Sequence, residues 1–219
     1  MKKITAITAQ RNSPNRVNIY LDGEFAFGLA RITAAWLKTG DELSDEKIAK
    51  LQDEDSRERA YQQAMLFLGY RARSEKEIRQ NLKKHEYAEG VIEYTLERLR
   101  KAGLANDNEF ARAWVENRNT FHPRSKKALA IEMRQKGLDD EAIQVSLSNV
   151  DEEALAYETG LKRAARFKSL ERNEFRKKLS EFLARRGFSY SIVASTVSRI
   201  WNETHADTKL YEYENEDML

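Results

Sequence analysis

Hydrophobic residues recur with a two-residue period in the first quarter of the chain and with a helical period after it. Three early segments are predicted to be strands: 4–10, 16–21 and 24–29. The second and third place apolar residues at every second position, as strands with one buried face do. Asp22 and Gly23, between the last two segments, suit a two-residue hairpin turn because both tolerate positive φ. A sheet this small is marginal alone, so we expect short helices at 32–37 and 45–51 to pack on it.

The aromatic residues of the third predicted strand allow two interpretations. Phe25, Phe27 and Leu29 lie two residues apart and therefore share one face of a regular strand. If that face were exposed, it would offer a platform for stacking of nucleic-acid bases. We favour the alternative, in which these side chains form part of the core of the module.

After residue 53, a helical pattern repeats three times with a period of about 50 residues. Apolar residues of the three copies lie in register at offsets of 51 and then 50: Ile78, Leu129 and Leu179; Leu82, Met133 and Leu183; Ile92, Ile143 and Val193. Each copy has a further apolar stretch upstream, which predicts additional helices at about 55–70, 107–119 and 153–167. A unit of this size buries little apolar surface alone, so the copies are expected to stack.

The ends of the predicted helices carry matching signals. Ser74 and Glu77 have the spacing of a capping box. Three other helices follow a good N-cap residue: Ser44, Asp139 and Ser189. After the second helix of each copy, Gly137 and Gly187 suit a left-handed helix end, whereas the first copy has Glu86 in that place. We therefore expect the first of these turns to differ from the others or to be strained.

These patterns predict a mainly α protein. Three three-helix repeats in tandem would form an elongated, curved body behind a small N-terminal module that contains a β-hairpin. The predicted parts are an N-terminal α+β module at 1–53, repeats at 54–105, 106–150 and 151–201, and an acidic tail at 202–219. The low content of Gly and Pro, 9 and 2 residues, also favours long helices over a many-turned β fold.

The composition narrows the classes of function. The chain has no Cys, which excludes disulfides, thiolate nucleophiles and Cys-ligated zinc. Its three histidines, His85, His122 and His205, lack the spacing of a zinc-binding pair on a helix, and no P-loop or Gly-x-Ser-x-Gly motif is present. His122 lies in the longest loop between helices and is a candidate functional residue, although we interpret it as a surface residue. We expect no catalytic residues, cofactor or metal.

No segment predicts membrane insertion or export. The longest apolar run, about residues 64–68, is far shorter than a membrane-spanning helix, and residues 1–5 lack the apolar core of a signal peptide. We therefore expect a cytoplasmic protein. We also expect that it acts as a monomer and, since no catalytic set is recognisable, that it is not an enzyme.

The net charge of +2 hides an asymmetry, because residues 1–201 carry +7 and residues 202–219 carry −5. A basic body with an acidic tail suggests a polyanionic partner and a segment that competes with it. We therefore hypothesise that the tail, from Asp207 to Asp217, shields a basic face. The alternative is an ordinary frayed terminus beside a solvated helical surface.

Two sets of basic residues are candidate contacts for such a partner. The densest stretch, 162–186, holds ten: Lys162, Arg163, Arg166, Lys168, Arg172, Arg176, Lys177, Lys178, Arg185 and Arg186. Part of this charge is paired, because Lys178 is four residues from Glu174 on the same helix. A second set precedes the second helices of the first two repeats: Arg71, Arg73, Arg124, Lys126 and Lys127. The structural alternative is that these arginine stems merely cover helix ends.

Several motifs together resemble the RecX family, bacterial regulators of the RecA recombinase. The main ones are LRKAGLANDNEFARAW at 99–114 and IEMRQKGLDDEAI at 131–143. The segment LARRGFSY at 183–190 resembles the third repeat of the family, and VNIYLDGEFAFGL at 17–29 is similar to the β-rich extension of its longer members. The resemblance covers about residues 4–201, and the order and spacing of its motifs make it specific. Glu86, the loop at His122-Pro123 and the acidic tail depart from the family pattern.

The resemblance implies a function in DNA repair, homologous recombination and the SOS response. Family members bind in the groove of the filament that RecA forms on single-stranded DNA, and they inhibit its ATPase, strand-exchange and coprotease activities. The implied partner is therefore the RecA nucleoprotein filament, with direct DNA contact through the basic faces. The resemblance supplies no catalytic residues. The alternative is a stand-alone, basic helical protein that binds nucleic acid mainly through residues 162–186.

Overall fold

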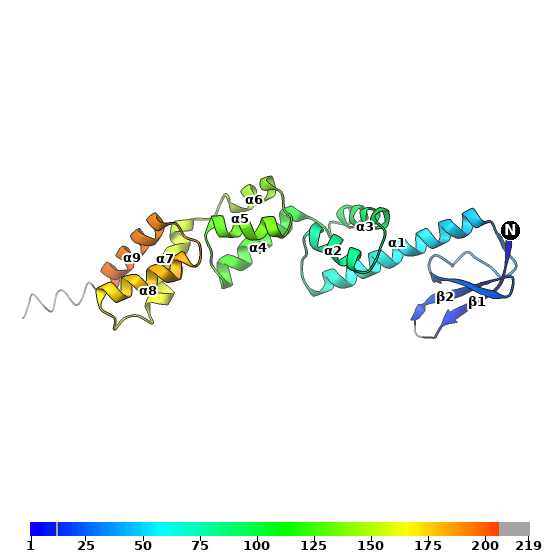
Figure 1. Ribbon diagram of the computed structural model, residues 1–219, viewed down its shortest axis with the longest axis horizontal. Coiled ribbons are helices and arrows are strands. Elements are labelled where there is room, and N and C mark those ends of the chain that lie inside the picture. The colour runs from blue at the N-terminus through cyan, green and yellow to red at the C-terminus, as the bar shows by residue number, and fades with distance from the viewer. Residues whose placement is uncertain (12, 206–219) are drawn as a thin grey trace, which may run out of the picture. The chain divides into compact units, whose positions relative to one another are not determined.

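The structure is a computed structural model that describes residues 1–11 and 13–205 of the chain. The described residues form two compact units, and the boundary between them lies between Asn106 and Asp107. The first unit contains the N-terminal module and the first repeat, and the second contains the other two repeats (Figure 1). Most of the tail expected at 202–219 lies outside the described residues.

The N-terminal module is an antiparallel sheet of four strands. The strands are β1 (Lys2–Gln10), β2 (Ser13–Leu21), β3 (Glu24–Ala30) and β4 (Glu42–Leu43), in the order β3-β2-β1-β4. The three strands expected from the sequence are confirmed, and the two-residue β4 was not expected. Asp22 and Gly23 both have positive φ in the hairpin turn. Ile4, Ile19 and Leu29 are fully buried beneath the sheet.

A β-bulge changes the face on which one aromatic side chain lies. Ile19 pairs with Phe27, but the next residue, Tyr20, pairs with Phe25, which leaves Ala26 as an extra residue in β3. Phe27 is buried, whereas Phe25 is 59% exposed and packs edge-to-face on Tyr20. The expectation that Phe25 joins the core was therefore wrong, because the bulge reverses the alternation at that point.

The prediction of two short helices at the end of the module was also wrong. Residues 31–36 form hydrogen-bonded turns instead of a helix. The helices expected at 45–51 and 55–70 are one continuous helix, α1 (Asp45–Tyr70), which Ser44 caps (Figure 1). Residues 52–54 contain no Gly or Pro, so nothing local interrupts the helix. The predicted domain boundary at 53/54 falls inside α1, and the division into domains stays a prediction.

The three expected three-helix repeats are confirmed. In the first, α1 packs with α2 (Glu75–Lys84) and α3 (Glu89–Lys101). The second contains α4 (Asp107–Phe121), α5 (Lys126–Gln135) and α6 (Asp140–Leu147). The third contains α7 (Glu152–Ala164), α8 (Arg172–Ala184) and α9 (Tyr190–Thr204). Each repeat has its own apolar core, which includes the residues that recur at the 50-residue period.

The expected helix caps are present. Ser74 and Glu77 form a complete capping box at α2, and Asp139 and Ser189 accept hydrogen bonds from the first turns of α6 and α9. Gly137 and Gly187 both have φ of +88°. Glu86 adopts φ of +61° in the equivalent turn, a conformation that strains a residue with a side chain. The expected strain at the first turn is therefore confirmed.

Replacement of Glu86 by Gly should stabilise the first repeat by about 1 kcal/mol, because relief of the left-handed strain exceeds the entropy that Gly adds to the unfolded chain. Hydrogen exchange of the α2 and α3 amides measures the change. Lys84→Gly, in the last turn of α2, is the matched control and should destabilise the same repeat by about 1 kcal/mol. Equal destabilisation by both substitutions would show that the turn at Glu86 is not strained.

Candidate anion-binding site between the second and third repeats

A tight contact joins the second and third repeats within the second unit. The backbone N–H of Ser125, the N-cap of α5, donates a 3.0 Å hydrogen bond to the carbonyl oxygen of Arg186. Next to it, a Cβ atom on Gly187 would lie 2.7 Å from Ser125 Oγ and 3.0 Å from Ala128 Cβ. The absence of a side chain at Gly187 therefore allows the turn after α8 to approach the start of α5. This contact places Arg185 and Arg186 beside the loop that precedes α5.

A small pocket forms at this contact, and most of its lining is basic. Its volume is about 270 Å³, and the residues that line it are Arg118, His122, Pro123, Arg124, Arg185 and Arg186. We call it the arginine pocket. Arg186 also lines an adjoining hollow of about 260 Å³, together with Lys162, Arg163 and Arg166. Basic side chains from α4, α7 and the turn after α8 therefore gather around Arg186.

Arg186 lies at the centre of this group. Its guanidinium packs 4.1 Å from the ring centroid of Phe182, and its Nε is buried without a hydrogen-bond partner among the described residues. Burial lowers the pKa of Arg186, and the neighbouring charges of Arg124, Arg163 and Arg185 lower it further. Arginine nevertheless stays protonated at neutral pH, so these positive charges repel one another.

Carboxylates neutralise only the edge of the group. Glu132 receives hydrogen bonds from Arg118 Nε at 2.8 Å and from Trp114 Nε1 at 3.0 Å, and it pairs with Arg124 at 3.2 Å. Arg185 lies 3.9 Å from Glu181 at the surface.

The centre of the group has no such partner. Across residues 1–11 and 13–205, no carboxylate pairs with Arg163 or Arg186. Arg163 stacks near Phe167 and Phe182, at 5.2 Å and 5.1 Å from the ring centroids, and its Nε is also buried without a partner. Guanidinium groups held in this way favour a phosphate or carboxylate ligand, to which each can make two parallel hydrogen bonds.

Two of the predicted partner contacts, Arg71 and Arg73, lie in the first unit and make local contacts at the start of α2. Arg71 pairs with Glu77 at 2.9 Å, and the guanidinium of Arg73 lies 4.0 Å from the ring centroid of Phe67. Burial, followed by the charge of Arg71, lowers the pKa of Arg73. The structural interpretation, in which these stems cover a helix end, therefore accounts for their contacts.

The structure separates the other predicted contacts into two groups. In addition to Arg124 and Arg186, four predicted contacts line the arginine pocket or the adjoining hollow: Lys162, Arg163, Arg166 and Arg185. Six lie on α5, on α8 or in the loop before α8: Lys126, Lys127, Lys168, Arg172, Arg176 and Lys177. Lys178 forms the expected pair with Glu174, at 2.7 Å. Arg118 was not predicted as a contact from the sequence, because a single arginine on the polar face of a helix does not stand out from other surface residues.

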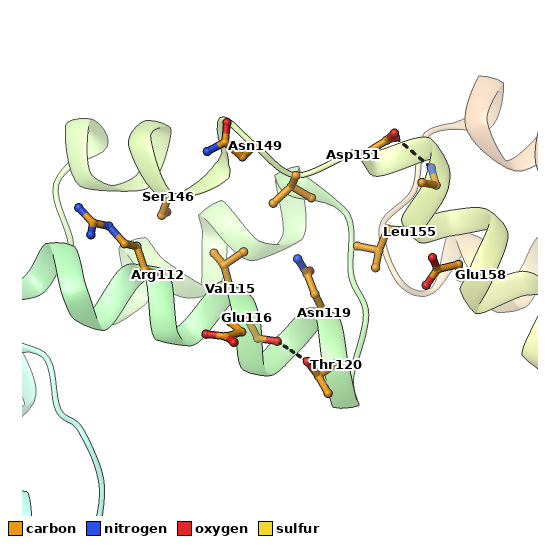
Figure 2. Close-up of a pocket in the computed structure, with 12 residues that line it drawn as sticks. Arg112, Val115, Glu116, Asn119, Thr120, Ser146, Asn149, Asp151, Leu155 and Glu158 are labelled. Atoms are coloured by element: carbon orange, nitrogen blue, oxygen red, sulfur yellow. Dashed lines mark hydrogen bonds between the residues drawn. The ribbon is translucent and has the colours of Figure 1, made fainter.

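The larger hollow of the second unit does not offer comparable chemistry. It lies between α4 and α7, with a volume of about 440 Å³ (Figure 2). Thr120 donates to the backbone oxygen of Glu116, and the Asp151 carboxylate accepts from the first turn of α7, as the dashed lines in Figure 2 show. These polar groups therefore form local hydrogen bonds within α4 and at the start of α7.

Neither a metal site nor a membrane-spanning helix is found in the part of the chain that the structure describes. No group of three or more His, Asp and Glu side chains within this part of the chain is arranged to hold a metal ion. No helix among these residues combines the length and apolar character needed to cross a membrane.

Family models match most of the described chain, in four consecutive segments. The model of the regulatory protein RecX N-terminal domain matches residues 2–44. Models of the first, second and third three-helix domains of RecX match residues 60–99, 106–147 and 151–197. The chain belongs to the RecX family. The resemblance inferred from the sequence motifs is thereby confirmed.

Individual RecX proteins show similarity over most of their lengths. Regulatory protein RecX of Bacillus subtilis (strain 168) is 33% identical over 214 residues, which cover 95% of this chain and 81% of that protein. The RecX of Amycolatopsis mediterranei (strain U-32) is 33% identical over 167 residues, 75% of this chain and 95% of its own. A crystal structure of regulatory protein RecX superposes with a TM-score of 0.68 at 29% identity, and the match covers 88% of this chain and 97% of that chain.

Proposed function

We propose that this RecX-family regulator binds the filament that RecA forms on single-stranded DNA and inhibits its ATPase, strand-exchange and coprotease activities. The observation that carries the proposal is the similarity to proteins named regulatory protein RecX over 95% of the chain. The protein would act in the cytoplasm, in recombination, DNA repair and control of the SOS response. It would act by occupying the filament, with no reaction of its own.

The arginine pocket supports a contact with a polyanion. Arg163 and Arg186 have no carboxylate partner within the described part of the chain, so an external phosphate or carboxylate would relieve their mutual repulsion. Lys162, Arg166 and Arg185 would extend this contact from the pocket over its rim. We assign the filament-binding surface to these residues and to the exposed basic residues of α8.

The deciding experiment is the ATPase activity of RecA on single-stranded DNA, with this protein added in amounts too small to coat the DNA. A progressive loss of ATP hydrolysis is expected, because a regulator that blocks or shortens a filament acts on many RecA subunits at once. No effect even at excess protein would contradict the proposal.

Arg185→Glu tests the surface directly. Loss of one charge-assisted contact costs about 1.5–3 kcal/mol, so the concentration needed for half-inhibition should rise about ten- to a hundredfold. The Arg185 side chain is largely exposed and should tolerate the change without loss of stability. Lys50→Glu is the matched control, an exposed residue of α1 in the first unit, and should inhibit RecA as the unmodified chain does. Equal inhibition by both variants would remove the arginine pocket from the filament contact.

The unpaired arginines also favour a second candidate function, binding of nucleic acid without RecA. This function requires tight binding to naked DNA that weakens steeply with salt and with charge reversal at Arg166 and Lys177. Lys178→Glu should have a smaller effect, because Lys178 is already paired with Glu174. A protein that inhibits RecA but binds naked DNA weakly would exclude this alternative.

A further inference from the structure

Arg186, in the arginine pocket, has no carboxylate partner among the described residues, and Arg124 and Arg185 beside it have only partly exposed ones. The sequence of this chain contains further carboxylates outside the described residues. Residues 206–219 hold five acidic residues and a single lysine: Asp207, Glu212, Glu214, Glu216 and Asp217, with Lys209. We infer that residues 210–217 of this segment bind the arginine pocket of the same molecule. The carboxylates would pair with Arg124, Arg185 and Arg186, and the segment would act as an internal competitor for any external polyanion.

The path from the end of α9 to the pocket is short enough. The ring of His205 stacks on Trp201 with a centroid distance of 3.7 Å and contacts Phe175, so the chain leaves the third repeat beside the start of α8. α8 leads from there to Arg185, and its 13 residues correspond to about 20 Å at 1.5 Å per residue. An extended chain covers about 3.3 Å per residue, so the seven residues from His205 to Glu212 reach about 23 Å.

The route itself is basic. α8 exposes Arg172, Arg176 and Lys177 between the end of α9 and the arginine pocket, and these side chains make no ion pair within the described part of the chain. The carboxylates of α8, Glu174 and Glu181, lie near Lys178 and Arg185, so a segment of opposite charge that follows the helix meets an excess of positive charge.

Apart from its negative charge, the spacing and type of the residues in this segment also suit the pocket. Residues 210–217 read LYEYENED, so aromatic and acidic residues alternate at first and carboxylates then recur at every second position. In an extended chain, alternate side chains lie on the same side about 7 Å apart, a spacing that can address successive guanidinium groups. Tyr211 and Tyr213 offer rings to arginine cations, and Phe121, 68% exposed at the edge of the adjoining hollow, offers an apolar contact.

Attachment to the same chain favours this occupant over a second molecule. A segment tethered by a few residues has an effective concentration in the millimolar range, so even a weak intramolecular contact is mostly formed. The contact itself does not depend on RecA. Only its consequence, that the segment must leave before a filament can bind, rests on the proposed function.

The experiment uses full-length chains and a fluorescent peptide of residues 206–219 as the probe, with fluorescence anisotropy in about 50 mM salt, where charges are weakly screened. In one variant, Glu212, Glu214 and Glu216 are replaced by Gln, which neutralises the internal competitor. This variant should bind the peptide at least tenfold more tightly than the unmodified chain. Equal affinity of the two chains, or no binding by the variant, would overturn the inference.

A second pair of variants locates the binding site. In the background with the three Gln substitutions, Arg185→Glu should weaken peptide binding at least fivefold, whereas Lys50→Glu should leave it within twofold. If the two substitutions weaken binding equally, the peptide does not use the arginine pocket and the inference fails. RecA is absent from this assay, so its outcome is separate from that of the ATPase experiment.

Discussion

Gly187→Ala should weaken the contact between the second and third repeats and destabilise the second unit by about 3 kcal/mol. One part of this cost is conformational, because Gly187 has φ of +88°, which an L-residue adopts only with strain. The other part is steric, because the new Cβ would lie 2.7 Å from Ser125 Oγ and 3.0 Å from Ala128 Cβ. The arginine pocket depends on this contact, so the RecA inhibition that we propose should fall with it.

Gly103→Ala separates the two parts of the cost. Gly103 has φ of +70°, but a Cβ built there meets no atom within 4 Å. Its replacement should therefore cost about 1 kcal/mol, from backbone strain alone. Hydrogen exchange of the Ser125 amide, which bonds to Arg186 in the native state, should accelerate in Gly187→Ala and stay unchanged in Gly103→Ala. An unchanged rate in both variants would show that the close approach is not needed.

The repeat architecture was predictable because its signals are local. Buried positions recur at the helical period within each copy, and a single polar residue, such as Ser74 or Asp139, fixes where a helix begins. The exceptional turn could be recognised in the same way, since Glu86 stands where the other copies have Gly. Each of these inferences needs only residues within a few positions of one another.

The wrong predictions concern features that the pattern of hydrophobic and polar residues does not encode. A two-residue period cannot show a bulge, so Phe25 was assigned to the core although it lies on the exposed face. The change of period near residue 53 suggested a break between helices, but a change in which face is buried does not require a break. Leu51 packs in the module and Ala60 in the first repeat, on the same helix.

The candidate site was predictable only in part. Charge density pointed to the stretch that contains Arg163, Arg185 and Arg186, but it gave equal weight to Lys178, which is paired with its neighbour. Arg118 lies almost 70 residues before Arg186, and only the docking of the two repeats brings both to one pocket. That docking depends on a contact between Gly187 and Ser125 that has no signature in either segment alone.

Asp55→Asn should destabilise the first unit by about 3 kcal/mol, because it breaks a largely buried ion pair. Asp55 is 5% exposed. Its carboxylate receives two hydrogen bonds from the Arg16 guanidinium, at 3.1 Å and 2.9 Å, and one from the Ala30 backbone N–H at 2.5 Å. These bonds connect α1 to β2 and to the end of β3. A neutral amide cannot accept both arginine bonds, so the charge of Arg16 would be left without a counter-charge in a partly buried position.

Asp53→Asn, on the same helix, is the matched control for this prediction. Asp53 pairs with Arg57 at 2.6 Å, but both side chains are about half exposed, and such surface pairs contribute at most about 0.5 kcal/mol. Hydrogen exchange of the β2 and β3 amides reports the first unit separately from the second. If Asp53→Asn and Asp55→Asn have equal effects, burial does not strengthen the Asp55 interaction, and the apolar contacts of Leu51 and Ile48 must hold the module on α1 instead.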